Sequence, residues 1–461
     1  MRASADPPDN TDVYDVIVVG GGLSGLIGGW QLRDRKVLVL ETTDRVGGRI
    51  KSAARGPHWI NLGAHLVSHG QAMHALATEL GVPLVVPPGL HGTTVAWGSR
   101  LIRARRPELL PFRLPLSLRD RVALARVGLR LKLAYGRAIR ADPCGLLGPH
   151  VDPPTMGADR DLGARPFADL LAGAGPRVSE ILRIAANRAA AEPGQISAHY
   201  VSLSPISAGE TPRYNVVGGT EELVLALRRG LGSRVRTSTG ATRVSQTADG
   251  VRVDAVGPGG PEVLRARAAI VAVPAPVVRT IVDGLPPAKE LALASIPYGA
   301  YVVAGFFTKE REPLPWSDRY MVVAPNRSFC LLFNAANASR TPGTSIGGGF
   351  IVYAGGQRAQ ELLASSDDAI AQVFLHDLAP LAPGLRDAIA EVLIQRWPLG
   401  NPITTMGRAA DQAAIASPVG RIHFAADYIG HPGMDSAASV AMHAAREIRG
   451  RLETDEVLHA A

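Results

Sequence analysis

The chain has 461 residues, of which 46% are hydrophobic and 20% charged, with a formal net charge of +8. This length allows two or three domains with substantial cores, and the composition excludes the disordered and fibrous classes. The two cysteines, Cys144 and Cys330, lie far apart in the sequence, which argues against a disulfide framework or a zinc site and fits a reducing compartment.

The N-terminal residues 1–11 are polar and contain two prolines, so they predict a disordered lead and no secretion signal. The apolar run 16–32 approaches the length of a membrane span, but glycines interrupt it and Asp12 and Asp15 precede it. We therefore expect no transmembrane helix in this run and a cytoplasmic location.

The segment 13–40 has the pattern of a strand, a helix and a second strand. The β-branched run 13–20 and the apolar run 37–40 flank a helical stretch at 23–32. This is the βαβ unit of a nucleotide-binding domain, with a right-handed crossover. Each glycine in a regular element costs about 0.5–1 kcal/mol relative to alanine, so six glycines between positions 20 and 29 indicate that a ligand approaches the backbone closely.

These glycines form a GxGxxG turn between the first strand and the helix. The first glycine permits the tight turn, the second lets the backbone approach a pyrophosphate, and the third allows helix and strand to pack closely. The turn and helix N-terminus expected to bind the cofactor comprise Gly20, Gly22, Leu23, Ser24 and Gly25. Glu41 closes the second strand, where its carboxylate can bind ribose hydroxyls.

The stretch DRVGGRI at 44–50 narrows the choice of cofactor. A GxGxxG turn, a glutamate and an RxGGR segment together resemble the FAD-binding start of the flavin amine oxidase superfamily, which includes monoamine and polyamine oxidases, protoporphyrinogen oxidases and phytoene desaturases. In that superfamily the second arginine of the segment, here Arg49, lies against the pyrophosphate and the flavin. A planar, permanently charged guanidinium suits that position.

Three further segments, 60–65, 216–227 and 420–448, resemble the superfamily's motifs in the same order. A strand pair at 241–253 also resembles the pair that touches adenine. The resemblance implies a non-covalent FAD, because no cysteine lies between 427 and 435. Beyond the first turn and Glu41, the implied cofactor contacts are Arg45, Gly47, Gly48, Arg49, Leu62, Gly63, Ala64, Val244 (through its backbone), Asp427 and Met434.

The sequence departs from the amine oxidases at several positions. Val303 occupies the place of a lysine that lies near flavin N5, and Gly433 that of a tyrosine of the amine-guiding aromatic cage. His65 matches a histidine of polyamine-oxidase-like members, and is either a proton acceptor at the flavin's substrate face or a packed core residue. A metal site from His65 and His69 lacks a third ligand, so we expect no metal.

The predicted fold class is α/β plus α+β, with a Rossmann-type FAD-binding lobe and a discontinuous substrate lobe of mixed sheet and helix. The FAD-binding domain is expected to comprise 12–66, 212–284 and 392–451, and the substrate-binding domain 67–211 and 285–391, with a tail at 452–461. Helices are predicted at 71–80, 118–140, 177–190, 366–378, 384–392 and 435–449, and strands at 268–273, 297–308, 319–333 and 345–353.

A basic segment spans residues 100–140. It holds twelve arginines and lysines against two acids, a local charge of +10. Such a segment is either a solvated helix face or a peripheral contact for a membrane or an acidic partner. Nucleic acid is not expected, because aromatic residues do not alternate with the arginines.

The sequence therefore predicts an FAD-dependent oxidoreductase that takes a hydride from a C–N centre of a small metabolite, with O2 as electron acceptor and H2O2 as product. The alternatives are a C–C dehydrogenase or porphyrinogen oxidase, and a flavin-binding homologue without turnover. The sequence also allows a homodimer.

Overall fold

The computed structural model describes residues 9–141, 160–202, 212–339 and 347–460. Its first sheet has the strand order β10-β2-β1-β13-β12-β11, and β19 also pairs with β13. The strands are β1 (Asp9–Val19), β2 (Val37–Leu40), β10 (Val235–Arg236), β11 (Gly240–Gln246), β12 (Val251–Gly257), β13 (Gly260–Val271) and β19 (Ile422–Phe424). Strands β10, β2, β1, β13 and β19 are parallel, whereas β12 and β11 run antiparallel.

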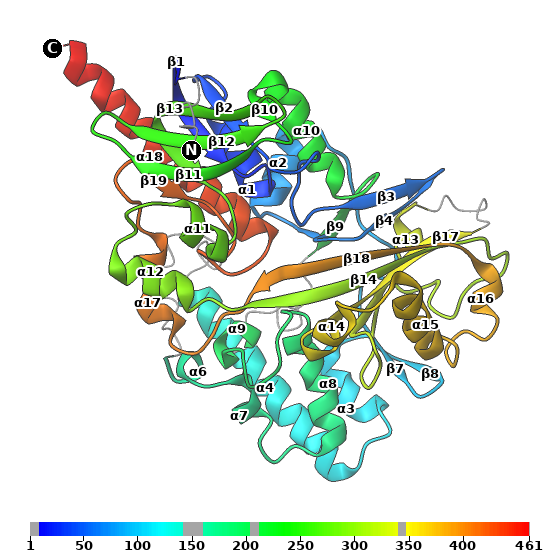
Figure 1. The fold of residues 1–461 in the computed structure, drawn as a ribbon. Helices are drawn as coiled ribbons and strands as arrows, with labels where there is room; N and C mark the ends of the chain where they lie inside the picture. Colours follow the sequence, from blue (N-terminus) through cyan, green and yellow to red (C-terminus); the bar gives the residue numbers. More distant parts are fainter. Residues whose placement is uncertain (1–8, 142–159, 203–211, 340–346, 461) are drawn as a thin grey trace, which may run out of the picture.

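Three helices pack together beside this sheet (Figure 1). They are α1 (Leu23–Gln31), α10 (Glu221–Leu231) and α18 (Met434–Ala460). The Ser24 hydroxyl donates to the Ala437 carbonyl over 3.1 Å, which ties the first turn of α1 to the start of α18. The central strands are buried along Val16–Val19 and Val37–Leu40, as expected for parallel strands covered on both faces. The first and last segments of the chain therefore share one core.

The second sheet has seven strands in the order β18-β14-β17-β16-β15-β7-β8. They are β7 (Thr93–Trp97), β8 (Arg100–Ala104), β14 (Tyr298–Thr308), β15 (Met321–Val323), β16 (Leu331–Phe333), β17 (Gly348–Gly355) and β18 (Ile389–Pro402). One face packs against α14 (Gln357–Leu362) and α15 (Asp367–Leu378). The other face carries Val303, Phe307 and Phe333, which pack on Ile60 and Leu62 beside the nucleotide-binding segments.

The remaining elements complete the two lobes. One small sheet pairs β3 (Ser52–Arg55) with β4 (His58–Asn61). Another pairs β9 (Arg213–Val216) with β5 (Val67–Ser68) on one side and with β6 (Leu84–Val85) on the other. The other helices are α2 (Ala72–Glu79), α3 (Leu110–Arg113), α4 (Leu118–Ala141), α6 (Arg160–Ala164), α7 (Phe167–Leu170), α8 (Pro176–Asn187), α9 (Ala198–Ser202), α11 (Ala275–Ile281), α12 (Pro287–Ala294), α13 (Ala336–Ser339), α16 (Leu385–Ala388) and α17 (Arg408–Ala416). None of the described helices is long and apolar enough to cross a membrane.

Several sequence expectations need correction. The helix predicted at 384–392 ends at Ala388, because the following residues pair with β14 as the start of β18. Helix α18 runs to Ala460, so the C-terminal segment is no separate tail, and Leu452 is buried at 1% exposure. Residues 9–11 belong to β1 rather than to a disordered lead, while residues 1–8 lie outside the described part.

Three expected domain boundaries do not coincide with breaks in the structure. Val67 and Leu76, beyond the expected boundary at 66, pack in the core of the first sheet, and so do Ala292 and Leu293 of α12, beyond the expected boundary at 284. Position 392 falls inside β18 of the second sheet. We therefore propose that the first boundary lies near residue 85 and the last near residue 402.

Lys289 on α12 hydrogen-bonds to the C-terminal end of α17, in the lobe that contains the first sheet. It is buried at 2% exposure, and its ammonium donates to the carbonyls of Ala414, Ile415 and Ser417 at 2.7–3.1 Å. The same ammonium lies 4.0 Å from the ring centroid of Phe424. A cation at a helix C-terminus satisfies carbonyls that have no partner within the helix.

Burial lowers the pKa of Lys289 to about 7, so the side chain is largely protonated at pH 6. At that pH we expect Lys289→Met to lower the free energy of unfolding by about 2–3 kcal/mol, because the buried carbonyls lose a charged donor. Urea denaturation followed by circular dichroism measures the loss. The control is Lys309→Met at an exposed position, which should change stability by less than about 0.5 kcal/mol. Equal stability of the two variants would contradict the role given to Lys289.

Candidate cofactor cradle and active site

The glycine turn after β1 contains two kinds of glycine. A Cβ on Gly25 would lie 1.8 Å from the Gly20 carbonyl oxygen, and a Cβ on Gly20 would lie 2.8 Å from that of Ala272. Gly20 also has a φ of 105°. Both positions exclude a side chain because of the fold itself. A Cβ on Gly22 would meet only the Gly48 Cα at 4.0 Å, so the fold alone does not require glycine there.

Gly22 is also the N-cap of α1, and it has no side-chain cap. Leu23 and Ser24 form the first turn of the helix behind it. The N–H groups of such a turn lack partners within the helix and can bind an anion. The open space at Gly22 is therefore where a phosphate can approach the backbone.

Glu41 lies directly beside this turn, at the end of β2. Its Oε2 accepts from the Gly21 N–H over 2.8 Å, and its Oε1 accepts from the Thr43 N–H over 2.8 Å. These two bonds fix the carboxylate at the carboxyl end of the parallel strands, where open α/β sheets bind ligands. Glu41 is therefore placed as the sequence predicts for a ribose contact.

The 45–50 loop lies against the glycine turn. Gly47 and Gly48 have φ values of 105° and 55°, and the Gly47 N–H donates to the Gly21 carbonyl over 2.8 Å. Arg45, which the sequence assigns to the cofactor, turns back into its own loop and donates to the carbonyls of Val46, Gly48 and Ile50. Arg45 therefore braces the loop instead of facing the turn.

Arg49 joins three distant parts of the chain. Its Nη2 lies 2.7 Å from Asp427 Oδ1, and its Nη1 donates to the Gly400 carbonyl over 3.2 Å. Burial alone would lower the pKa of Arg49, but the Asp427 carboxylate outweighs that effect and the pKa is raised. The guanidinium therefore keeps its charge, which suits the contact to pyrophosphate and flavin that the sequence predicts.

The 62–64 segment packs against the backbone of the Arg49 loop. The Ala64 N–H donates to the Arg49 carbonyl over 3.1 Å, and a Cβ on Gly63 would lie 2.1 Å from the same oxygen. The Trp397 indole donates to the Leu62 carbonyl over 2.8 Å. The glycine turn, Glu41 and the 45–50 loop together form the candidate cofactor cradle. The 62–64 segment links this cradle to the second sheet.

The start of α18 completes the cradle near Met434. Asp435 accepts from the Met73 N–H over 2.9 Å, and burial raises its pKa to about 6. The Ser436 hydroxyl is fully buried without a hydrogen-bond partner. An unpaired buried hydroxyl at a helix N-terminus fits a polar ligand at that end.

The structure does not support the adenine contact at Val244. Its side chain is fully buried, and its carbonyl already accepts from the Asp283 N–H over 2.9 Å. Gly240, at the start of β11, lies closer to Glu41. A Cβ on Gly240 would lie 3.0 Å from the hydroxyl oxygen of Thr42, the residue after Glu41. The start of β11 is therefore a better candidate than Val244 for an adenine contact.

His65 lies between the cradle and a cluster of aromatic side chains. Its Nδ1 is 3.3 Å from the Gly63 carbonyl, and its ring meets Phe333 edge-on with centroids 4.5 Å apart. The His65 Nε2 is buried and has no hydrogen-bond partner. Burial lowers the pKa of His65 to about 4, so the imidazole is neutral at neutral pH.

The sequence analysis missed most of this aromatic cluster. Phe333 stacks on Tyr353, and Tyr353 meets Tyr301 edge-on with centroids 5.7 Å apart. The Tyr301 hydroxyl donates to the carbonyl of Arg188, the residue that follows α8. A lone arginine in the apolar run 184–191 was the one available sequence signal, because charged residues are seldom placed among apolar ones without a partner.

His65 and His69 do not form a metal site. They lie in loops on either side of β5, so helical spacing does not apply, and His69 contacts the Tyr214 hydroxyl at 3.1 Å. Among the described residues, no group of three histidine, cysteine, aspartate or glutamate side chains could hold a metal ion.

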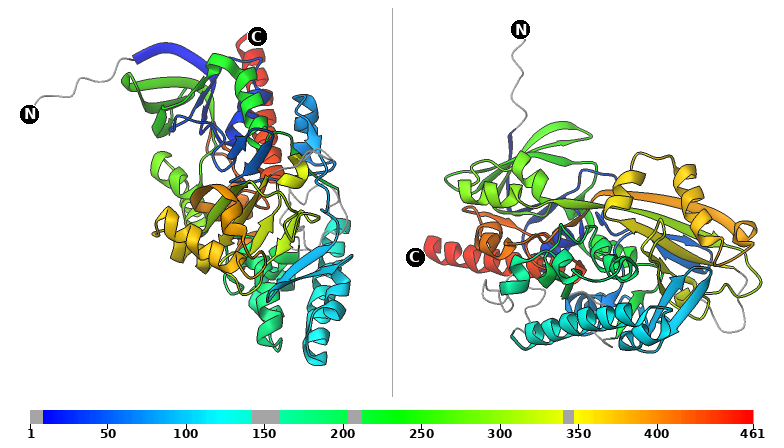
Figure 2. Two further views of the ribbon diagram at one scale, coloured as in Figure 1. Left: turned by 90° about the vertical axis from the view of Figure 1, so that its right-hand side faces the viewer. Right: turned by 90° about the horizontal axis from the view of Figure 1, so that it is seen from below.

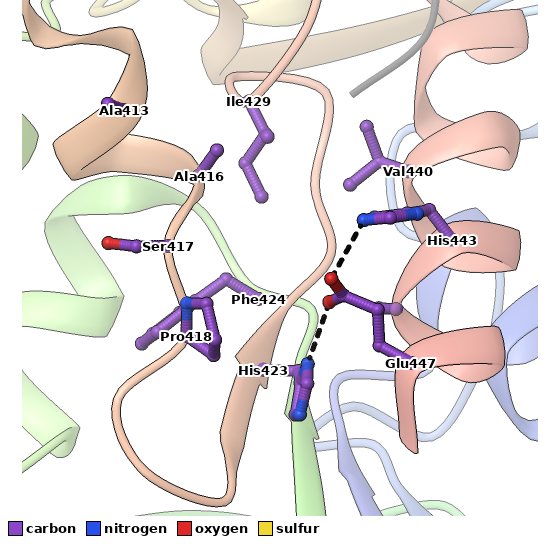
Figure 3. Close-up of a pocket in the computed structure, with 11 residues that line it drawn as sticks. Ala413, Ala416, Ser417, Pro418, His423, Phe424, Ile429, Val440, His443 and Glu447 are labelled. Carbon is purple, nitrogen blue, oxygen red and sulfur yellow. Dashed lines mark ion pairs between the residues drawn. The ribbon is translucent and has the colours of Figure 1, made fainter. Parts of the chain in front are cut away.

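A separate hollow lies between β19, α17 and α18 (Figure 3). Glu447 joins two imidazoles there, at 3.3 Å from His423 Nδ1 and 3.2 Å from His443 Nε2. Burial lowers the pKa of His423 despite the nearby carboxylate. The lining residues contribute nothing to the cradle or to the aromatic cluster, so we assign the hollow no part in the candidate site.

Residues 23–449 match the sequence profile of the flavin containing amine oxidoreductases. The chain belongs to this family. FAD is therefore its cofactor, as the sequence predicts, and the observed cradle fits it. Open space at Gly22, a fixed carboxylate at Glu41 and the Arg49–Asp427 ion pair offer groups suited to a phosphate, a ribose and a flavin.

Relatives within the family differ in chemistry. An L-amino-acid oxidase of Demansia vestigiata is 25% identical over 94% of this chain and 86% of its own length. A coproporphyrinogen III oxidase of Mycobacterium bovis is 29% identical over 62% of this chain and 66% of its own. A solved structure of putrescine oxidase bound to putrescine has a TM-score of 0.78 at 20% identity and covers 95% of this chain and 99% of that one. The structural likeness shows the shared fold.

Gly22→Ala tests whether the open space at Gly22 belongs to the cofactor. We expect the apoprotein to lose at most about 1 kcal/mol of stability, because the fold leaves room for the methyl group. FAD affinity should fall at least about tenfold, because the methyl group occupies the phosphate's approach. Titration of apoprotein with FAD, followed by flavin fluorescence, measures the affinity.

The matched control is Gly128→Ala on α4, where a Cβ also meets no atom within 4 Å. This variant should bind FAD as the unaltered chain does. An unchanged FAD affinity in Gly22→Ala would show that no phosphate passes this position.

Proposed function

We propose that this chain is an FAD-dependent oxidase that converts a C–N single bond of a small amine to an imine. Loss of a hydride from the neutral amine leaves a protonated imine, and FAD held by the glycine turn, Glu41 and Arg49 would supply the hydride acceptor, with O2 as the final electron acceptor and H2O2 as the product. The proposal is carried by the position of His65, whose unpaired Nε2 lies between the cofactor cradle and the aromatic cluster. That nitrogen can accept a hydrogen bond from a substrate N–H.

His65 is proposed to orient the amine rather than to take a proton from an ammonium group. Because its pKa is about 4, the imidazole is a weak base. Val303, at the position of the expected lysine, is 6% exposed among apolar neighbours and supplies no base. The substrate is therefore expected to react as the neutral amine.

We expect His65→Ala to slow anaerobic reduction of the bound flavin by about 10²-fold or more, with unchanged FAD content, because the amine loses its acceptor. Stopped-flow absorbance measures the rate. His69→Ala, at an exposed position, is the control and should reduce at the unaltered rate. An unchanged rate in His65→Ala would remove this residue from the mechanism.

The pH profile gives a second test of the neutral-amine proposal. The value of kcat/KM should rise with pH up to the pKa of the free substrate amine, because only the neutral form reacts. It should show no step near pH 6.5, because His65 is already neutral above about pH 4. A step near 6.5 that disappears in His65→Ala would mean that the imidazole titrates near its ordinary pKa and must be neutral for the reaction, which would contradict the lowered pKa.

The alternatives from the sequence are C–C dehydrogenation, porphyrinogen oxidation and flavin binding without turnover. A panel of amines and a porphyrinogen, each mixed anaerobically with the protein, separates them. Bleaching of the flavin by amines alone supports the proposal, whereas bleaching by the porphyrinogen alone supports the second alternative. No bleaching by any compound supports the third.

We also propose that α4 and the preceding turn form a docking face for an anionic membrane surface. Phe112, Leu118, Val122, Leu129 and Leu133 are between 51% and 78% exposed. The exposed cations beside them are Arg113, Arg119, Arg126, Arg130, Lys132 and Arg137. Figure 2 shows α4 at the outer edge of the molecule in both views. Apolar and basic side chains on one exposed helix are typical of interfacial binding.

The protein should sediment together with phosphatidylserine-containing vesicles. The double variant Val122→Ser, Leu129→Ser should bind these vesicles at least about tenfold more weakly, because apolar contact area is lost. The control, vesicles of phosphatidylcholine alone, should retain little protein. Equal sedimentation with both vesicle types, or with neither, would contradict the docking face. Dimerisation remains a prediction from the sequence.

A further inference from the structure

Arg188 is a cation that lies inside the aromatic cluster without an acidic partner. Its Nε is buried and has no hydrogen-bond partner, and no carboxylate of the described residues forms an ion pair with it. A charge in such surroundings is normally paired. Resting on the amine oxidation proposed above, we infer that the substrate carries a carboxylate and that Arg188 binds it.

The backbone around Arg188 is held in one position by neighbours from the second sheet. A Cβ on Gly299 would lie 1.9 Å from the Ala190 carbonyl oxygen, and a Cβ on Gly355 would lie 2.0 Å from that of Asn187. Ala190 itself has a φ of 58°, which is unfavourable for a residue with a side chain. The close approach of two strands thus fixes the arginine before any ligand arrives, which lowers the entropy cost of binding.

The C-terminal end of β18 connects the loop that carries Arg188 to the cofactor cradle. The Asn401 amide donates to the Ala189 carbonyl over 3.1 Å, and the neighbouring Gly400 carbonyl accepts from Arg49. Two consecutive residues of one strand therefore contact the flavin-side arginine and the Arg188 loop. A ligand bound by Arg188 lies on the cradle side of the second sheet, as a substrate of the flavin must.

The groups that face Arg188 are donors or neutral side chains. They are His65, Tyr200, Tyr301, Cys330 and Tyr353, together with the cation Arg213. Burial raises the pKa of Cys330 to about 12 and of Tyr200 to about 12, so both keep their protons at neutral pH. Burial also raises the pKa of Tyr301 and Tyr353. None of these groups can neutralise the guanidinium.

A structural role at the end of α8 does not account for the side chain. An arginine at a helix C-terminus commonly donates to the last carbonyls. Here the last carbonyls of α8 already accept hydrogen bonds from backbone N–H groups. Ala189 and Ala191 donate to the Ala186 carbonyl, and Ala190 donates to the Asn187 carbonyl. The guanidinium forms a hydrogen bond with the Tyr353 hydroxyl, while its buried Nε has no partner and remains available to a ligand.

The arrangement selects among amines by charge. A planar guanidinium binds a carboxylate through two parallel hydrogen bonds, and the Tyr353 hydroxyl beside it, which keeps its proton, can add a further donor. A second ammonium group in place of the carboxylate would face the positive charges of Arg188 and Arg213. The substrate class is therefore an amino carboxylate that places its amine at His65 and its carboxylate at Arg188, and diamines are excluded.

The test compares amino acids with the amines that lack only the carboxylate, such as phenylalanine with phenethylamine and lysine with cadaverine. We expect the amino acid of at least one pair to reduce the flavin anaerobically at least about 10²-fold more efficiently than its amine, because a charged bidentate contact is lost with the carboxylate. Benzoate, a carboxylate without an amine, should perturb the flavin spectrum and inhibit competitively.

Arg188→Met should lower kcat/KM for the amino acid at least about 10²-fold and remove the benzoate response, so the ratio of kcat/KM for the amino acid to kcat/KM for its amine should fall. Arg177→Met, an exposed position on the same helix, is the matched control and should behave as the unaltered chain. FAD content and thermal stability show that both variants fold.

The outcomes separate the two proposals. If neither member of any pair reduces the flavin, the proposed amine oxidation itself fails. If amines reduce the flavin as well as amino acids do, or if Arg188→Met keeps the preference for amino acids and the benzoate response, the carboxylate assignment is wrong while amine oxidation stands.

Discussion

The ion pair between Arg49 and Asp427 is the contact on which the rest of the site depends. It joins residues 378 positions apart at 2.7 Å, and the same guanidinium also binds the Gly400 carbonyl. The Asp427 side chain is 10% exposed and that of Arg49 is 31% exposed, so removing Arg49 would leave a buried carboxylate without its charged partner. The pair ties together the 45–50 loop, the end of β18 and the segment between β19 and α18.

The glycines serve this assembly by letting backbones meet. Gly25 lies against Gly20 and Gly63 lies against Arg49 at distances that no Cβ could occupy. In the other lobe, Gly299 and Gly355 do the same for the loop that carries Arg188. Close approach of backbone to backbone fixes both halves of the site without long side chains, whose rotamer freedom would have to be lost on folding.

The sequence predicted the cradle better than the substrate side, for a physical reason. Gly20, Glu41 and Arg49 occur in local patterns whose geometry follows from chain order within one βαβ unit. The sequence placed the adenine contact at Val244, whereas the start of β11 is the better candidate in the structure. The exposed part of β11 depends on its pairing with β12, which spacing does not reveal. Arg188 went unassigned, because only tertiary packing distinguishes a buried helix-end arginine from a solvated one.

Backbone strain accompanies both residues that we propose to contact substrate. Leu66, next to His65, has a φ of 74°, and Ala190, two residues beyond Arg188, has one of 58°. Each costs about 1–2 kcal/mol for a residue with a Cβ, and such strain persists only where the surrounding structure enforces it. Its presence at both ends of the aromatic cluster is consistent with a rigid site in which His65 and Arg188 keep a fixed separation. A site of that kind selects substrates by the spacing between amine and carboxylate as well as by their charges.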